Sequence, residues 1–231
     1  MSRPEFAPDE LRRCVDGVLR ARRSVRAFKP DPVPRGEVRE ILQVASRAPS
    51  NSNTQPWRVH VLTGERKRRL GEALVAAFQA GTLPPSAHFP EPLPPAFGER
   101  QAGFAQRYYE CLGIPRDDAA ARARQTECNF RFFGAPVGLI FSIDARLTRH
   151  SWLDLGLFVQ NVMIAAKARG LDTCPQVSFA RFHPVIAEHL RMAPEELTAC
   201  GMSLGFAEAD APVNRMQMPR LDVEQFVRFH D

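Results

Sequence analysis

The sequence lacks any apolar run that approaches the roughly 18 residues needed to cross a membrane, and its first residues lack the apolar core of a signal peptide. At 44% hydrophobic and 25% charged, its 231 residues have the balance of an ordinary globular protein with one sizeable core. The composition therefore predicts a cytoplasmic protein and argues against a membrane protein.

Cysteine is scarce and histidine is poorly spaced for metal binding. The five cysteines are an odd number and contain no C-x-x-C pair, so we expect reduced, mostly buried thiols rather than a disulfide framework or a zinc site. The six histidines include no H-x-x-x-H or H-E-x-x-H spacing, and no metal site is predicted. Neither G-x-G-x-x-G nor a P-loop occurs, so any phosphate must be held in another way.

A possible nucleophile motif, G-M-S-L-G at 201–205, matches the G-x-S-x-G pattern of hydrolases. That motif needs a helix directly after the serine and a histidine further along the chain. The residues that follow form a poor helix, and His230 is the only later histidine. Small residues on a buried strand explain the match better, and we reject a serine hydrolase.

Positive charge is concentrated near the N-terminus. Residues 1–70 contain 16 Lys and Arg against 8 Asp and Glu, whereas the whole chain has a net charge of +5. Within this region Arg20, Arg22, Arg23 and Arg26 surround Ser24. Guanidinium groups match the geometry of phosphate, so the cluster either faces an anion or is simply solvated. No basic stripe with stacking aromatic residues accompanies it, and nucleic-acid binding is not expected.

A polar loop is expected at 48–57, A-P-S-N-S-N-T-Q-P-W. Ser50, Asn51, Asn53 and Gln55 each carry donors and acceptors. Such residues are typical of turns, so an ordinary helix-to-strand loop is one interpretation and a binding loop is the other.

The spacing of apolar residues predicts a mixture of helices and strands. Helices are predicted, the first capped by Asp9, at 10–22, 36–48, 101–112, 117–132, 151–170 and 183–190. Strands are predicted at 57–63, 135–144 and 198–208, with a strand or loop at 171–179. Residues 79–100 contain six prolines and predict a long loop, whereas helix 151–170 is apolar on nearly every face and must be buried all round. Without regular βαβ alternation, the order predicts one α+β domain over 1–231, with an insertion at about 79–128.

Several of these segments, taken in order, resemble the nitroreductase family of FMN-dependent oxidoreductases. The segments are R-R-S-V-R-A-F, N-T-Q-P-W, F-F-G-A-P-V-G-L-I-F-S-I-D, the glycine-ended helix, and S-L-G-F with A-P-V-N-R-M-Q-M-P-R-L-D-V-E-Q-F-V. The resemblance implies a three-layer sandwich, with a central, mainly antiparallel sheet flanked by helices and a lid-like insertion. It also implies a homodimer with two flavins at the subunit interface.

The resemblance further implies a set of flavin contacts. The outer arginines hold the phosphate together with Arg220, Arg215 being a weaker candidate, and Arg26 approaches the pyrimidine side of the ring. Asn53 matches the family's ring-binding Asn, in a loop partly donated by the second subunit. The full set is Arg22, Arg23, Ser24, Arg26, Pro49, Ser50, Asn51, Ser52, Asn53, Gln55, Arg131, Pro175, Gln176, Val177, Ser178 and Arg220.

The implied activity passes electrons from NAD(P)H to nitroaromatic or quinone-like acceptors by a ping-pong mechanism. No side chain acts as a nucleophile, because the flavin N5 performs the chemistry. Arg26 stabilises the reduced flavin, and the backbone at Val177 and Ser178 orients N5. The insertion is expected to cover the flavin, with Phe104 and its aromatic neighbours Tyr108 and Tyr109 stacking on a flat substrate. The alternatives are a flavin-binding or flavin-sequestering protein without NAD(P)H turnover, and a flavin-fragmenting or dehalogenating relative.

Overall fold

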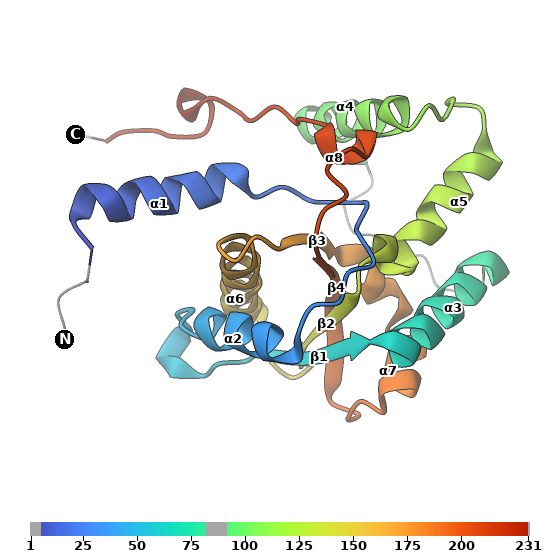
Figure 1. Cartoon of the computed structure of the whole chain (residues 1–231), viewed down its shortest axis with the longest axis horizontal. Coiled ribbons are helices and arrows are strands. Elements are labelled where there is room, and N and C mark those ends of the chain that lie inside the picture. The colour runs from blue at the N-terminus through green and yellow to red at the C-terminus, as the bar shows by residue number, and fades with distance from the viewer. Residues whose placement is uncertain (1–5, 82–91, 231) are drawn as a thin grey trace.

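The computed structural model describes residues 6–81 and 92–230, and these form helices on both faces of one sheet (Figure 1). The helices are α1 (Pro8–Ala21), α2 (Arg35–Ala45), α3 (Gly64–Ala80), α4 (Pro95–Cys111), α5 (Ala119–Phe130), α6 (Arg149–Lys167), α7 (His183–Leu190) and α8 (Pro212–Arg215). The strands are β1 (Arg58–Thr63), β2 (Val137–Asp144), β3 (Asp172–Gln176) and β4 (Glu196–Gly205). Short 3₁₀ turns are η1 (Asn51–Asn53), η2 (Phe132–Gly134), η3 (Val177–Phe182) and η4 (Val223–Gln225).

The sheet is antiparallel throughout, in the order β1-β2-β4-β3. Because successive strand residues point to opposite faces, β2 contributes Leu139 and Phe141 to one core and Ile140 to the other. The first core lies under α2 and α6, and the second lies under α3 and α7. This arrangement is the predicted α+β sandwich, and the fold class is confirmed.

Several element boundaries differ from the sequence prediction, and proline explains two of the differences. Asp9 does not cap α1: the helix begins at Pro8 after Ala7, and Asp9 lies in the first turn, where its carboxylate pairs with Arg12 at 3.1 Å. Proline is well suited to the first helical position because its φ is already fixed there. The same preference lets α4 begin at Pro95, so the predicted loop over 79–100 is wrong at its C-terminal end. It is also wrong at its N-terminal end, because α3 continues to Ala80. Residues 82–91 of that prediction lie outside the described residues.

Three apolar surfaces find no partner within the described part of the chain. Helix α6 buries one face but exposes Trp152, Leu153 and Leu157, with 66% of Leu153 accessible, so packing within one chain does not bury this helix all round. Helix α1 buries no residue. Exposed apolar side chains on α1 and on the C-terminal segment are Leu11, Val15, Leu19, Leu221, Val223, Phe226 and Phe229. Both segments extend to the same side of the domain (Figure 1).

Two strand glycines allow aromatic rings to lie directly on the sheet. A Cβ at Gly201 would lie 2.8 Å from the ring of Phe179, and one at Gly138 would lie 2.6 Å from the ring of Phe132. Such distances are shorter than any ordinary contact, so both positions require glycine. The two rings fix η3 and η2 against the sheet, and thereby the ends of β3 and α5.

A buried carboxylate links β1, β2 and β4. His60 Nε2 lies 2.7 Å from Glu196 Oε1, and the Ser142 hydroxyl donates to the same oxygen. Burial alone raises the pKa of Glu196, but the hydrogen bonds from Ser142 and His60 and the positive charge of Arg58 lower it, and the net shift is downward. The ionised form is therefore the one that the folded protein stabilises.

We expect this carboxylate to make stability fall in acid. Because the folded pKa lies below the unfolded value of about 4.3, the stabilisation is present above that value and is lost as pH falls through the folded pKa. Replacing Glu196 by Gln should lower the free energy of unfolding at pH 7 by about 1–3 kcal/mol and flatten its dependence on pH below 4.5. Urea titrations from pH 3 to 8, with the exposed Glu188→Gln as control, measure both. An unchanged acid slope in Glu196→Gln contradicts this assignment.

The cysteines are less buried than the sequence suggested. Cys174 and Cys200 are buried, but Cys14 and Cys128 are exposed, and all five thiols are free. Burial raises the pKa of Cys174 to about 11, against the opposing charges of Arg26 and Arg22, and raises that of Cys200 to about 12. Within the described residues no group of three or more potential metal ligands gathers, and none of the helices is long and apolar enough to span a membrane.

We expect brief alkylation at pH 8 to modify Cys128 and to leave Cys174 and Cys200 intact. Burial raises the pKa of all three thiols, but only Cys128 is exposed to the reagent. Peptide mass spectrometry reads the modified positions, and the same reaction in 8 M urea should modify all five cysteines. Rapid modification of Cys174 in the native protein would show that its thiol is accessible and ionised.

Candidate functional site

Residues 22–26, which we call the arginine segment, lie along the edge of the sheet beside β3. Val25 N donates to Thr173 O at 3.0 Å, and Ser24 forms a parallel bridge with the same residue. Further along, Phe28 pairs with Ala207 after β4. The backbone is therefore fixed, and Arg22, Ser24 and Arg26 are all half-buried.

Asn214 in α8 is hydrogen-bonded to this segment, a role that the sequence did not indicate. Its Oδ1 accepts from Arg26 N at 2.8 Å, and its Nδ2 donates to Ala27 O at 2.7 Å. Its carbonyl oxygen accepts from Arg23 Nη1 at 3.1 Å. The only sequence signal is an asparagine after P-V, in a segment that the sequence indicates is irregular.

The arginines carry uncompensated charge. Among the described residues no carboxylate forms an ion pair with Arg22, Arg23 or Arg26. Three guanidinium groups within five residues repel each other unless an anion or solvent screens them. The donor set therefore suits a phosphate.

Next to this segment, at the end of β3, Gln176, Asn129 and Ser178 form a hydrogen-bonded group that we call the polar platform. Gln176 is buried, and its Nε2 donates to Asn129 O at 2.6 Å while its Oε1 accepts from Ser203 Oγ at 2.9 Å. Asn129 Nδ2 donates to Ser178 Oγ at 2.7 Å. Gln176 thus holds the turn in place, whereas Val177 is 58% exposed. Asn129, at the end of α5, is a polar member of this platform that the sequence analysis missed. Pro175 lies in the same strand, half-buried and paired with β4.

The polar loop lies elsewhere in the chain. Asn51 N donates to Asp154 Oδ2 at 3.1 Å, which places η1 against the N-terminal half of α6. Ser52, Asn53 and Gln55 adopt positive φ values of 51°, 57° and 47°, and the side chains from Asn51 to Gln55 are exposed. Pro49 is exposed and Ser50 half-buried, with Ser50 Oγ accepting from Gln55 N. Within the described residues no hydrogen bond joins this loop to the arginine segment; its hydrogen bonds are to α6 and within the loop itself.

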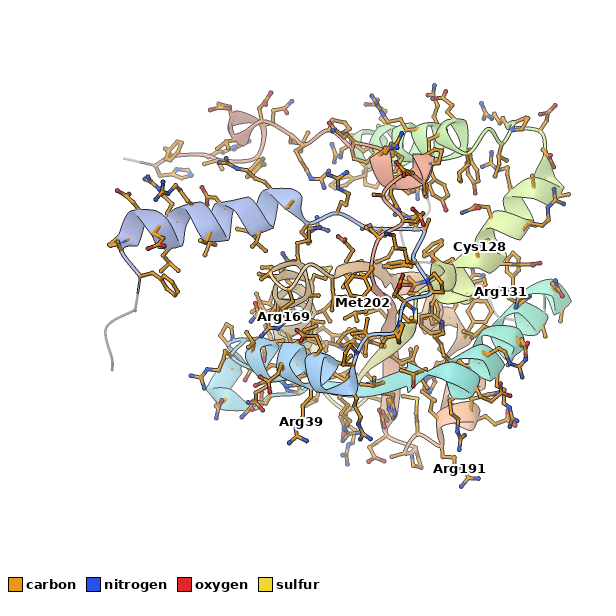
Figure 2. All side chains as sticks on the ribbon, in the orientation of Figure 1. Arg39, Cys128, Arg131, Arg169, Arg191 and Met202 are labelled. Atoms are coloured by element: carbon orange, nitrogen blue, oxygen red, sulfur yellow. The ribbon has the colours of Figure 1, made fainter. Side chains whose placement is uncertain are left out.

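Of the remaining predicted contacts, Arg131 ends α5 on the side of α3. Figure 2 labels it near Cys128, and it lines a cleft of about 160 Å³ with Lys67, Arg68 and Gly71. Arg220 is exposed in the C-terminal segment, and Arg215 pairs with Asp210. Among the described residues no hydrogen bond or ion pair joins Arg131 or Arg220 to the arginine segment, and their roles remain predictions.

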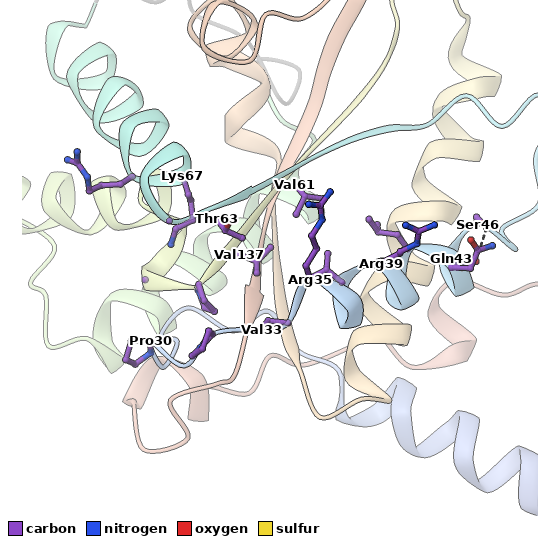
Figure 3. Close-up of a pocket in the computed structure, with 17 residues that line it drawn as sticks. Pro30, Val33, Arg35, Arg39, Gln43, Ser46, Val61, Thr63, Lys67 and Val137 are labelled. Atoms are coloured by element: carbon purple, nitrogen blue, oxygen red, sulfur yellow. Dashed lines mark hydrogen bonds between the residues drawn. The ribbon is translucent and has the colours of Figure 1, made fainter.

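A cavity of about 1150 Å³ lies apart from this site. It is a groove between α2, the unpaired edge of β1 and the start of α3 (Figure 3). Val33, Val38 and Val61 line its apolar part, and Arg35 and Arg39 line its charged part. We call it the β1 groove.

Comparison with known proteins identifies the family. Residues 19–206 match the nitroreductase family. The chain is 49% identical to a 4-nitrobenzoate reductase of Pseudomonas putida, over 93% of this chain and 94% of that protein. It is 44% identical to a nitrobenzene nitroreductase of Ectopseudomonas oleovorans, over 93% and 96% of the two chains. The crystal structure of the FMN-dependent nitroreductase NfnB from Mycobacterium smegmatis, in complex with NADPH, superposes with a TM-score of 0.91 at 33% identity over 96% of this chain and all of that one.

The chain therefore belongs to the nitroreductase family. The predicted class of enzyme, an FMN-dependent NAD(P)H oxidoreductase, is confirmed with the family. The residues present fit FMN, because unpaired guanidinium groups for a phosphate lie beside a platform of neutral amide and hydroxyl groups for the edge of a ring.

Proposed function

We propose that this protein reduces small nitroaromatic compounds with electrons from NAD(P)H, using FMN held on the arginine segment. The observation that carries the proposal is the set of three arginines without carboxylate partners, fixed at the edge of β3 beside the amides of Gln176 and Asn129. The names of relatives at 44–49% identity, which act on 4-nitrobenzoate and nitrobenzene, support an aromatic nitro compound as the acceptor.

Each part of the site has a separate task in this proposal. FMN, when bound, accepts hydride from NAD(P)H and transfers electrons to the acceptor. Arg22 and Arg23 bind the phosphate, assisted by Arg220. The guanidinium of Arg26 stabilises negative charge on the pyrimidine side of the ring. The backbone N–H groups at Val177 and Ser178 orient the reactive edge, and because Val177 is exposed, this edge is open to substrates.

The site is completed by a second copy of the chain. The loop at 49–55 lies on α6 rather than on the arginine segment, and α1, α6 and the C-terminal segment all expose apolar side chains. Such contiguous apolar surface is typical of an interface. In this homodimer the loop of one copy reaches the flavin of the other.

The two substrates use one binding face in turn. The sequence contains no G-x-G-x-x-G motif for a separate dinucleotide site. A single open edge at Val177 serves both NAD(P)H and the acceptor. This arrangement gives ping-pong kinetics, and stacking favours flat acceptors, so quinones are included with nitroaromatics. In the described part of the 79–128 insertion, α4 lies beside the site, where Phe104 and Tyr108 contact Arg26.

The experiment is spectroscopic and then kinetic. The purified protein should be yellow, and NADPH or NADH should bleach it without oxygen until a nitroaromatic compound restores the colour. Initial rates at several fixed acceptor concentrations should give parallel double-reciprocal lines. Intersecting lines contradict the alternation of substrates, and a bound flavin that neither nicotinamide bleaches favours a sequestering protein.

A further inference from the structure

The guanidinium of Arg26 lies against two aromatic rings of α4. Its Cζ is 5.2 Å from the ring centroid of Phe104 and 5.3 Å from that of Tyr108. The two rings are nearly parallel, 14° apart in plane, with centroids separated by 5.5 Å. The three groups therefore form a triangle of almost equal sides, a geometry in which the cation is attracted to both ring faces.

The aromatic pair is itself held in place. Tyr108 is buried, and its hydroxyl accepts a hydrogen bond from Gln125 Nε2 of α5 at 2.7 Å. Tyr109 packs edge-on against it, with centroids 5.3 Å apart. Burial raises the pKa of Tyr108, so its phenol stays neutral beside the arginine.

Rings hold a guanidinium differently from a carboxylate. An ion pair would fix Arg26 but would also cancel the charge that the flavin needs. A neutral aromatic face attracts the cation and leaves its net charge available to another anion. The backbone of Arg26 is tied to Asn214. Its guanidinium is held by one hydrogen bond, from Nη1 to Ser24 O at 3.3 Å, and by the two rings of α4.

We propose that Phe104 and Tyr108 are positioning residues that aim the charge of Arg26 at the flavin ring and so raise its reduction potential. The proposal rests on the proposed function, which makes Arg26 a flavin contact. It also changes the role expected for these two rings, which the sequence indicated as contacts for a flat substrate. Because Arg26 lies over one face of each ring, the two rings control the driving force for electron transfer as well.

The test is the midpoint potential of FMN in the dimeric holoenzyme, measured by anaerobic titration with a reference dye. Phe104→Leu and Tyr108→Leu should each weaken binding of reduced relative to oxidised FMN by about tenfold, which for a two-electron couple lowers the potential by about 30 mV. Phe104→Tyr, which keeps a ring, should retain the wild-type potential. The matched control is Phe97→Leu, because Phe97 is exposed on the same helix and contacts Arg100 instead.

A double variant separates action through Arg26 from direct contact. If the rings act through the arginine, Phe104→Leu causes no further shift once Arg26→Gln is present. An equal shift of Phe104→Leu in both backgrounds, or no shift in either, overturns the proposal. Failure of the wild-type protein to bind FMN overturns the proposed function as well. If FMN binds but Arg26→Gln leaves its midpoint potential unchanged, the role of Arg26 and of the two rings is overturned while the proposed function stands. Should Tyr108→Leu fail to fold, the half-buried Phe104 carries the test alone.

Discussion

Replacing Arg22 by alanine should lower the affinity for FMN by about ten- to a hundredfold while leaving the fold intact. Arg22 ends α1, is half-buried beside β3 and has no carboxylate partner among the described residues. A charge-assisted hydrogen bond to phosphate contributes about 1.5–3 kcal/mol, and no neighbouring acid is left unpaired when the guanidinium is removed. Titration of apoprotein with FMN, followed by flavin fluorescence, measures the loss.

Three further variants test whether the loss of FMN affinity comes from the guanidinium at position 22. Arg22→Lys keeps the charge but loses the forked donors, so its affinity should fall between the wild-type and alanine values. Arg69→Ala removes an exposed arginine that pairs with Glu65 on α3, and it should leave the affinity unchanged. Arg220→Ala should weaken binding to a similar extent as Arg22→Ala. Full affinity in both alanine variants means that the phosphate is held elsewhere.

Placing a glutamate at Leu153 should convert the dimer to a monomer and remove most of the FMN. Leu153 is the most exposed apolar residue of α6, and η1 is hydrogen-bonded to the next residue of the same helix, Asp154. An isologous interface buries each substituted position twice, and an uncompensated buried charge costs about 3–5 kcal/mol. Light scattering at micromolar protein should give the mass of one chain, and the ratio of flavin to protein absorbance should fall with it.

Leu147→Glu is the control for this variant, because Leu147 is also apolar and exposed but lies in the turn before α6. It should remain dimeric and yellow. A monomeric Leu153→Glu protein with full flavin content would show that the loop at 49–55 is not donated across an interface. A wild-type protein that is already monomeric would refute the dimer itself.

The sequence determined the fold class because periodicity is a local property. Alternating apolar residues in 57–63 and the continuous apolar run at 135–144 became β1 and β2, and Gly170, with a φ of 74°, follows the end of α6 as expected. The buried strand at 198–208 also explains the G-M-S-L-G match, since Ser203 is buried and donates to Gln176. The family likewise followed from short segments that keep their order along the chain.

Only the tertiary structure decided how the site is assembled, because its members interact across long separations in the chain. Asn214 fastens Arg23 and Arg26, which lie nearly two hundred residues earlier. Asn129 meets Ser178 because Phe132 and Phe179 lie on glycines of adjacent strands. The contacts of Arg26 with Phe104 and Tyr108 depend on α4, whose aromatic residues the sequence predicts equally well as substrate contacts. Local pattern fixes which face of an element is apolar, but which polar groups meet at its ends depends on how the elements pack against one another.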